Sequence, residues 1–363
     1  MLRVGMLTSG GDCQGLNATM RAVAKTLFEY YQDEVEILGY KDGYKGLMLA
    51  DYRVMHESDF SGILTLGGTI LGTSRQSFKD IDEPLFEDSK ETRCEAMVRN
   101  YKMQDLDCLV VLGGNGSHKS ANRLSEEGLN VITLPKTIDK DIYGTEMTFG
   151  FQSAVNIATD VIDSIHSTAT SHGRVFIIEL MGNKAGWLTL HAGIAGGADI
   201  ILLPEIPYNI NSVVYALNER ERKGKRFSII AMAEGARSEK DEDLSKKDFR
   251  KLMEKNGWPS VSYKLAEELD EIMPKEVRIV VPGHYQRGGK PSSYDRVFCT
   301  RVGSYAAHLI IEGKFGQAVV QQNNEITSMD LDEVAGKKSL VSPDDPMVQA
   351  ARDMGISFGD EEI

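Results

Sequence analysis

Short apolar runs of strand length alternate along the chain with amphipathic stretches of helix length. Several runs are hydrophobic at consecutive positions, which is typical of parallel strands that helices cover on both faces. This alternation predicts an α/β fold with right-handed crossovers between the strands. The expected strands are 4–7, 35–38, 108–112, 131–134, 175–180, 200–203, 227–233 and 277–281, and the clearest helices are 15–31, 117–127, 151–167 and 212–223.

Length and charge narrow the class of protein. At roughly 100–200 residues per domain, 363 residues predict about two domains. The 54 acidic and 41 basic side chains give a net charge of −13, which argues against a sequence-independent nucleic-acid binder. An anionic substrate would therefore need arginines and lysines gathered locally.

Nothing in the sequence predicts a membrane or secreted protein. No apolar run approaches the roughly 18–20 residues of a membrane span, and the apolar start at 2–7 is too short for a signal peptide. The 4 cysteines are scattered without a C-x-x-C pair, which argues against a zinc ribbon or disulfide framework. We expect a reduced, cytoplasmic protein, with a solvated segment at 238–255 and an acidic stretch after 328.

Glycine-rich turns follow the first and third expected strands. Residues 7–17 read LTSGGDCQGLN and residues 112–117 read LGGNGS, each between a strand and a helix. Glycine amides at a helix N-terminus can approach a phosphate closely, although such turns also serve merely as tight connections. Neither turn is a P-loop, and the absence of G-x-G-x-x-G argues against a nicotinamide dehydrogenase.

A charged turn follows the fourth expected strand. It reads PKTIDKD over 135–141 and places Asp139 and Asp141 just beyond a buried strand. The cations Lys136 and Lys140 would keep a carboxylate ionised, and the Thr137 hydroxyl would bind a ligand. A solvated acidic turn is the alternative interpretation.

Further candidates lie around the later strands. Arg174 precedes one strand, MGNKAG at 181–186 follows it, and Arg278 lies on another strand that leads to GHYQRGG at 283–289. Because arginine binds phosphate in a bidentate manner, Arg278, His284 and Arg287 predict a phosphate site. Surface ion pairing is the alternative for each of them alone.

The order of these motifs resembles that of the 6-phosphofructokinase family from residue 1 to about residue 325. The matching series is TSGGD, GTSR, GGNGS, PKTIDKD, MGNKAG, AEG and GHYQRGG. The resemblance implies two Rossmann-like three-layer α/β/α domains with mainly parallel sheets and an active site in the cleft between them. It places a donor domain at 1–138 and about 285–340, a sugar-phosphate domain at 139–284, and an acidic C-terminal tail at 341–363.

The resemblance also implies an activity, in which ATP-Mg phosphorylates the 1-hydroxyl of fructose 6-phosphate to give fructose 1,6-bisphosphate and ADP in glycolysis. Asp139 matches the general base, Thr137 would orient it, and Asp141 would order the sugar and metal environment. Arg75 matches the arginine that stabilises the transferred phosphoryl group. The donor positions are Gly11, Arg75, Gly113, Asn115, Gly116 and Ser117, and the sugar-phosphate positions are Thr137, Asp139, Asp141, Arg174, Met181, Gly182, Glu234, Arg278, His284 and Arg287. Of these, Arg174 and Arg278 match residues donated by a neighbouring subunit, which implies a homo-oligomer, either dimer or tetramer.

The chain departs from the family pattern at several charged positions. Asn115 replaces the usual aspartate near the metal, Asn183 replaces an arginine, and Lys140 replaces an asparagine. Gly116 is typical of ATP users, whereas pyrophosphate users carry aspartate there. Lys136 is typical of pyrophosphate users, so pyrophosphate stays open as an alternative donor. A catalytically weakened regulatory subunit is a further alternative. The candidate effector positions, for which a solvated surface is the other interpretation, are Arg21, Lys25, Arg53, His166, Lys223 and Lys225.

Overall fold

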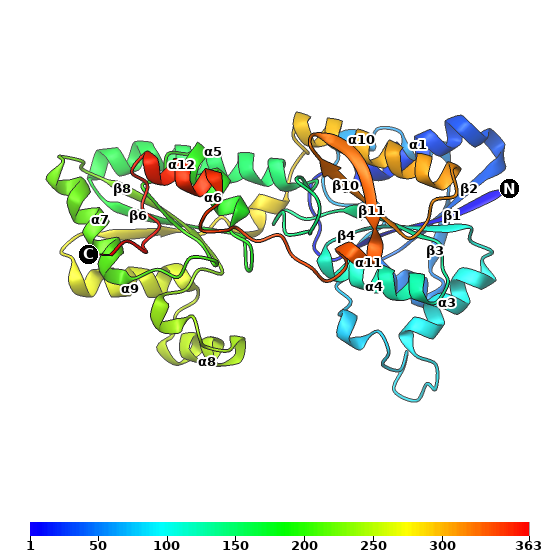
Figure 1. Cartoon of the computed structure of the whole chain (residues 1–363), viewed down its shortest axis with the longest axis horizontal. Coiled ribbons are helices and arrows are strands. Elements are labelled where there is room, and N and C mark those ends of the chain that lie inside the picture. Colours follow the sequence, from blue (N-terminus) through cyan, green and yellow to red (C-terminus); the bar gives the residue numbers. More distant parts are fainter. Residues whose placement is uncertain (363) are drawn as a thin grey trace. The chain divides into compact units, whose positions relative to one another are not determined.

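A computed structural model describes residues 1–362 and contains two compact units. Unit 1 is Met1–Ser153 with Arg287–Ser339, and unit 2 is Ala154–Gln286 with Leu340–Ile363. Each unit has a β-sheet with helices on both faces (Figure 1), which confirms the predicted three-layer α/β fold with mainly parallel sheets. The domain boundaries inferred from the motifs concern ligand-binding roles and stay a prediction.

Unit 1 is built on a 7-stranded sheet with the order β11-β10-β5-β4-β1-β2-β3. The β2–β3 and β10–β11 pairs are antiparallel, and the other pairs are parallel. The strand order reverses between β1 and β4, where Ser9 lies opposite Gly113, and ligands bind outside the carboxyl ends of strands at such a reversal. The strands are β1 (Leu2–Ser9), β2 (Val35–Tyr40), β3 (Tyr52–Met55), β4 (Cys108–Gly113), β5 (Val131–Pro135), β10 (Gln317–Gln322) and β11 (Glu325–Asp330).

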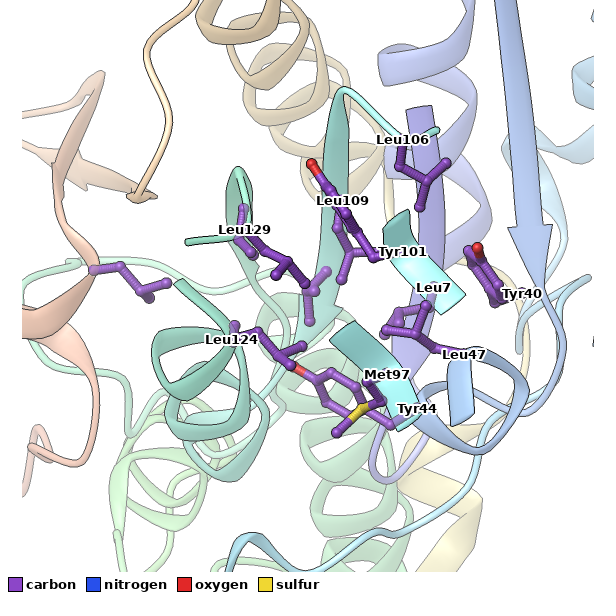
Figure 2. Close-up of a cluster of buried hydrophobic side chains, with 14 of the residues drawn as sticks. Leu7, Tyr40, Tyr44, Leu47, Met97, Tyr101, Leu106, Leu109, Leu124 and Leu129 are labelled. Carbon is purple, nitrogen blue, oxygen red and sulfur yellow. The ribbon is translucent and has the colours of Figure 1, made fainter. Parts of the chain in front are cut away.

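Helices α1 and α10 cover one face of this sheet, and α3 and α4 cover the other (Figure 1). Figure 2 shows Leu7 of β1 and Leu109 of β4 among buried side chains that include Met97 of α3 and Leu124 of α4. Every residue of β4 is buried, as its continuous apolar run predicts. The helices are α1 (Leu16–Tyr31), α2 (Tyr44–Leu49), α3 (Arg93–Met103), α4 (Asn115–Glu126), α10 (Ser293–Ile311) and α11 (Leu331–Val334).

Unit 2 contains a parallel 4-stranded sheet with the order β7-β8-β6-β9. Val213 of α7 and Leu265 of α9 pack with Ile177 and Ile230 on one face, and α5, α6 and α12 lie on the other (Figure 1). The elements are α5 (Phe151–His172, which starts in unit 1), β6 (Val175–Leu180), α6 (Trp187–Ala195), β7 (Ile200–Leu202), α7 (Ile210–Arg222), β8 (Ser228–Ala233), α8 (Lys246–Asn256), α9 (Val261–Ile272), β9 (Val277–Val280) and α12 (Pro346–Asp353).

The stretch expected to be an acidic tail is folded into unit 2. Its residue Ser357 pairs with β7, since its carbonyl accepts from the Ile201 amide at 2.9 Å. Phe358 is 0% exposed, so the segment contributes a core side chain and covers a sheet edge. In contrast, α8 buries none of its residues, as the solvated interpretation of 238–255 predicts, although Ser238 and Asp241 at the start of that stretch are buried. None of the helices within residues 1–362 has the length and apolar character required to cross a membrane.

Candidate active site

The first glycine turn follows β1 and is held by the GTSR turn. The Gly10 amide donates to the Ser74 carbonyl at 3.1 Å, and Thr73 Oγ1 donates to the Gly10 carbonyl at 2.7 Å. Gly10 has φ +86°, a conformation that glycine adopts without steric cost. These hydrogen bonds bring Arg75, at the end of the GTSR turn, to the carboxyl end of β1.

Positive side chains surround this turn, and we call Arg75, Lys136 and Arg287 the cationic cluster. A Cβ on Gly11 would lie 3.1 Å from Arg287 Nη1 and 3.5 Å from Arg75 Nη2, so glycine keeps the approach open. Arg287 Nη1 donates to the Asp12 carbonyl at 3.0 Å, and Lys136 Nζ donates to the Gly11 carbonyl. The buried Nε of Arg287 has no hydrogen-bond partner among the described residues, so it is a donor available to an anion.

Lys136 is 4% exposed, which makes it an unusual lysine. Burial lowers its pKa from the ordinary value, and Arg287 lowers the pKa further, whereas the carboxylates of Asp139 and Asp12 raise it. A phosphate bound beside Lys136 would supply the negative charge that favours the ammonium form. The cationic cluster is therefore electrostatically suited to a phosphate group.

The second glycine turn follows β4, next to the first. A Cβ on Gly113 would lie 2.2 Å from Ser117 Cβ, so only glycine permits the tight entry into α4. Gly116 is different, because no atom beyond its own helical turn lies within 4 Å of its Cβ position and its φ is not positive. The turn thus presents the N-terminus of α4 as an anion site with open space at Gly116.

Polar side chains of α4 define the charge of this site. Burial lowers the pKa of His118 to about 4, so its imidazole is neutral at pH 7 and adds no positive charge. The Asn115 side-chain amide donates to the Lys337 carbonyl, which leaves its oxygen as an acceptor.

The candidate base Asp139 lies in the turn after β5, which is the strand next to β4. Its backbone amide donates to Thr137 Oγ1 at 3.0 Å, and the Thr137 carbonyl accepts from Thr148 Oγ1 at 2.7 Å. Lys140 has φ 53°, a backbone conformation that asparagine tolerates better than lysine. The asparagine that the family carries at this position is therefore favoured by the backbone conformation as well as by its lack of charge.

Asp141 is buried and paired. Lys338 Nζ lies 2.8 Å from Asp141 Oδ2, and the Ser339 amide donates to the Asp141 carbonyl at 3.1 Å. The segment that includes Lys337 and Lys338 thus contacts both Asn115 and Asp141. No local spacing in the sequence predicts these contacts, because they join residues 197 and 222 positions apart.

In unit 2, the expected sugar positions follow neighbouring strands. Leu180 of β6 lies opposite Ala233 of β8, so Met181 and Glu234 leave the sheet side by side. The Gly182 amide lies 3.5 Å from Glu234 Oε1, and the Met181 amide donates to Gln286 Oε1 at 3.3 Å. His284 is exposed on the 3₁₀ helix Gly283–Arg287, which follows β9, whereas Arg287 belongs to unit 1.

Arg174 and Arg278 lie at the other end of the same sheet. Arg174 immediately precedes β6, and both guanidinium groups pair with the carboxylate of Glu276 just before β9. The 6 residues of β6, at about 3.3 Å each, separate this end from Met181 by about 17 Å or more. One unit 2 therefore cannot bring these arginines to its own Met181 and Glu234.

The candidate effector residues are divided between the units. Lys25 pairs with Glu57 at 3.4 Å and Arg53 pairs with Asp59 at 3.6 Å, and Arg21 lies one turn before Lys25 on α1. In unit 2, His166 Nε2 donates to the Gly196 carbonyl at 2.7 Å, while Lys223 and Lys225 follow α7. Their effector role stays a prediction.

The described residues include no preformed metal cage. Within 1–362, no group of 3 or more His, Cys, Asp and Glu side chains is arranged to hold a metal ion. Magnesium commonly binds through one or two carboxylates together with substrate phosphates. The Asn115 oxygen, just beyond β4, fits this second type of site.

Taken together, glycine turns, clustered cations and a carboxylate at adjacent strand ends define an α/β phosphate-binding protein. A family model described as Phosphofructokinase matches residues 3–310. The chain is 50% identical over 357 residues to a Spirochaeta thermophila protein named ATP-dependent 6-phosphofructokinase. The aligned region covers 98% of this chain and 97% of that protein. It is 44% identical over 365 residues to ATP-dependent 6-phosphofructokinase 3 of Bacteroides thetaiotaomicron, at 99% and 100% coverage. The phosphofructokinase of Pichia pastoris in the T-state matches with a TM-score of 0.76 and 28% identity, covering 92% of this chain and 35% of that chain. The chain belongs to the phosphofructokinase family, which confirms the resemblance of its motifs.

We predict that Lys136→Met stabilises the ligand-free protein and weakens ATP use. Removing a buried ammonium group relieves the free-energy cost of its desolvation, so we expect the variant to be more stable than wild type without ligand. Because the pKa of Lys136 is lowered on folding, wild-type stability should rise with pH as this lysine deprotonates, and the variant should lack that rise. Urea unfolding at several pH values measures both effects.

Lys45→Met is the matched control, since Lys45 is exposed on α2. It should change neither stability nor the stabilisation that added ATP gives. A Lys136→Met protein that ATP stabilises as strongly as wild type would contradict the assignment of Lys136 to the phosphate site.

Proposed function

We propose that this chain transfers the γ-phosphoryl group of ATP to the 1-hydroxyl of fructose 6-phosphate, with Asp139 as the general base. The observation that carries the proposal is the cationic cluster around Gly10 and Gly11, with Asp139 on a nearby strand end of the same unit. Family membership, with ATP-dependent relatives at up to 50% identity, supports ATP as the donor.

In this proposal the donor phosphates lie between the two glycine turns. The N-terminus of α4 and the amides near Gly11 bind the phosphate oxygens, and Arg75 stabilises the charge on the transferred group. Ser117 and Gly113 shape the turn, since their close approach fixes the first residues of α4. Phosphoryl transfer depends mainly on such positioning and electrostatic stabilisation.

Asp139 accepts the proton of the sugar hydroxyl as that oxygen attacks the γ-phosphorus. The Thr137 hydroxyl holds the Asp139 backbone in place, and Lys338 pairs with Asp141. Met181, Gly182 and Glu234 bind the sugar in this proposal, and His284 and Arg287 bind its 6-phosphate.

Magnesium belongs to the proposal as an ion that accompanies ATP. It would be held by the donor phosphates with the oxygen of Asn115, in surroundings that Asp141 orders, and it would neutralise charge on those phosphates. The neutral amide at Asn115 places less negative charge there than aspartate would. The chain's own Arg75 and Lys136 then supply the remaining positive charge.

We also propose a homo-oligomer in which Arg174 and Arg278 complete the site of a neighbouring subunit. Their location at the amino-terminal end of the sheet, opposite Met181 and Glu234, supports this arrangement. Within one chain both guanidinium groups pair with Glu276, whose carboxylate a sugar phosphate would replace. We place the enzyme in the cytoplasm, and its free, buried cysteines suit a reducing compartment.

Two alternatives have specific observations in their favour. Lys136, a feature of pyrophosphate users, lies in the cationic cluster and favours pyrophosphate as donor. Asn115 and Asn183 reduce the charge of the site and favour a weakened regulatory subunit. A coupled assay with fructose 6-phosphate, magnesium and either ATP or pyrophosphate decides among the three, because a regulatory subunit would turn over neither donor.

We expect Asp139→Asn to lower kcat by about 10²–10⁴ because the amide cannot accept the proton. Binding of fructose 6-phosphate should change little, since the shape is preserved. Steady-state kinetics measure kcat, and calorimetry measures binding. Asp163→Asn, on an exposed position of α5, is the control. A variant that keeps more than about half of the wild-type kcat would remove Asp139 from the role of base.

Sharing of the site predicts that two inactive proteins restore activity together. Arg278→Ala lacks the donated arginine and Asp139→Asn lacks the base, but a mixed oligomer contains some sites with both groups intact. Activity of the mixture, measured after confirmed subunit exchange, should exceed that of either protein alone. If it does not, each chain forms its site by itself.

Gly116→Asp should lower kcat/KM for ATP by about 10² or more, with a smaller loss or a gain for pyrophosphate. A factor of about 10² needs only about 2.7 kcal/mol of repulsion between the new carboxylate and the α-phosphate. The open space at Gly116 and its ordinary φ argue against general damage to the fold. The kcat/KM values for both donors are the measurement, and Gly116→Ala is the control for size. Equal losses for both donors would contradict donor selection at this position.

A further inference from the structure

Unit 1 contains a buried carboxylate, that of Asp295, which the proposed mechanism does not use. Asp295 is 0% exposed and occupies the first turn of α10. It accepts from the Gly150 amide at 3.1 Å, the Ser153 amide at 2.8 Å and Ser153 Oγ at 2.5 Å. Burial raises the pKa of Asp295, and these donors oppose the rise by stabilising the carboxylate.

One side of this network leads to the base. Gly150 directly follows Phe149, whose amide donates to the Pro135 carbonyl at 3.1 Å. Thr148 Oγ1 donates to the Thr137 carbonyl at 2.7 Å, and Thr137 Oγ1 accepts from the Asp139 amide at 3.0 Å. The turn that Asp295 holds therefore supports residues 136–141, which we call the base loop.

The other side leads to the cationic cluster. Ser153 Oγ donates to Asp295 and accepts from the Ser292 amide at 2.8 Å. Ser292 ends the segment 287–292, which we call the Arg287 loop. The segment begins with Arg287, whose guanidinium donates to the Asp12 carbonyl at 3.0 Å. The Ser153 hydroxyl thus joins Asp295 to the loop that carries Arg287, and the Asp295 amide adds a direct link by donating to Ser292 Oγ at 3.1 Å.

We propose that Asp295 is a positioning residue that holds the base loop through Thr148 and the Arg287 loop through Ser153. The proposal rests on the proposed roles of Asp139 and Arg287. A carboxylate is required because every group directed at it is a donor, and an amide at 295 would place its own N–H groups against them. The two loops come from distant parts of the sequence, so a shared anchor sets their spacing.

The network offers a separate variant for each side. Thr148→Val removes only the hydroxyl that supports the base loop, and Ser153→Ala removes only the hydroxyl between Asp295 and Ser292. Thr148→Val should lower kcat by about 10-fold or more with little change in KM, because misplacement of a reacting group by about 1 Å costs up to about 10² in rate. Ser153→Ala should raise KM for fructose 6-phosphate several-fold with little change in kcat.

Asp295→Asn should show both effects, and Ser293→Ala, an exposed neighbour on α10, should show neither. Backbone amide exchange gives a second readout. Thr148→Val should accelerate exchange in the base loop alone, Ser153→Ala in the Arg287 loop alone, and Asp295→Asn in both. If Asp295→Asn fails to fold, Thr148→Val and Ser153→Ala still test the proposal, because each affects only one side of the network.

Equal changes in kcat and KM from Thr148→Val and Ser153→Ala, with exchange accelerated throughout unit 1, would show a general packing role and overturn the proposal. Wild-type kinetics and exchange in all three variants would overturn it as well. If the wild type transfers no phosphoryl group to fructose 6-phosphate, the proposed function fails. The exchange pattern still tests the Asp295 anchor in that case.

Discussion

The phosphate site of unit 1 depends on one constraint, the burial of the Lys136 ammonium group beside the glycine backbone of the first turn. Lys136 has lost most of its hydration, and its nearest strong acceptor is the carbonyl of Gly11. The positive potential there exists only because glycine leaves room for Arg287 and Arg75 to approach the same turn. The whole chain has a net charge of −13, so the positive potential at this turn arises only because the fold brings cationic side chains together.

The direction of parallel strands organises the rest. Loops at the carboxyl ends of β1, β4 and β5 carry the donor and base positions, and those of β6 and β8 carry the sugar positions. Residues at the amino ends, such as Arg174 beside Glu276, face the opposite direction. The parallel sheets therefore place Arg75 and Arg287 with the glycine turns and Arg174 and Arg278 at the far ends of β6 and β9.

The sequence was most informative where burial and backbone geometry act locally. The run at 175–180 coincides with β6, and the glycine turns lie where their strand–turn–helix context placed them. The antiparallel strands β3, β10 and β11 were not predicted, because they are edge strands or edge neighbours with weaker apolar patterns. Folding of 341–362 into unit 2 was also missed, since its buried apolar residues, which include Val341, Val348 and Phe358, are separated by charged and polar residues.

Long-range polar pairs lay outside the reach of sequence reasoning. Lys338 beside Asp141 and Gln286 beside Met181 join segments more than a hundred positions apart, and neither has a local spacing rule. Asp295 did have a local signal, as Ser292 and Asp295 form the S-x-x-D pattern of a helix start. That pattern predicts a cap, but the contact with Ser153 depends on the tertiary fold.

The empty space beside Gly116 affects which substitutions the protein can accept during evolution. Most substitutions at a glycine in a tight turn damage folding, so selection removes them before any effect on chemistry appears. At residue 116 an added Cβ meets no neighbour, so we expect substitutions there to leave the fold intact. A single G-to-A transition converts the glycine codons GGT and GGC into aspartate codons. The step from glycine to aspartate at this position therefore needs one base change and no rearrangement of the backbone around the new Cβ.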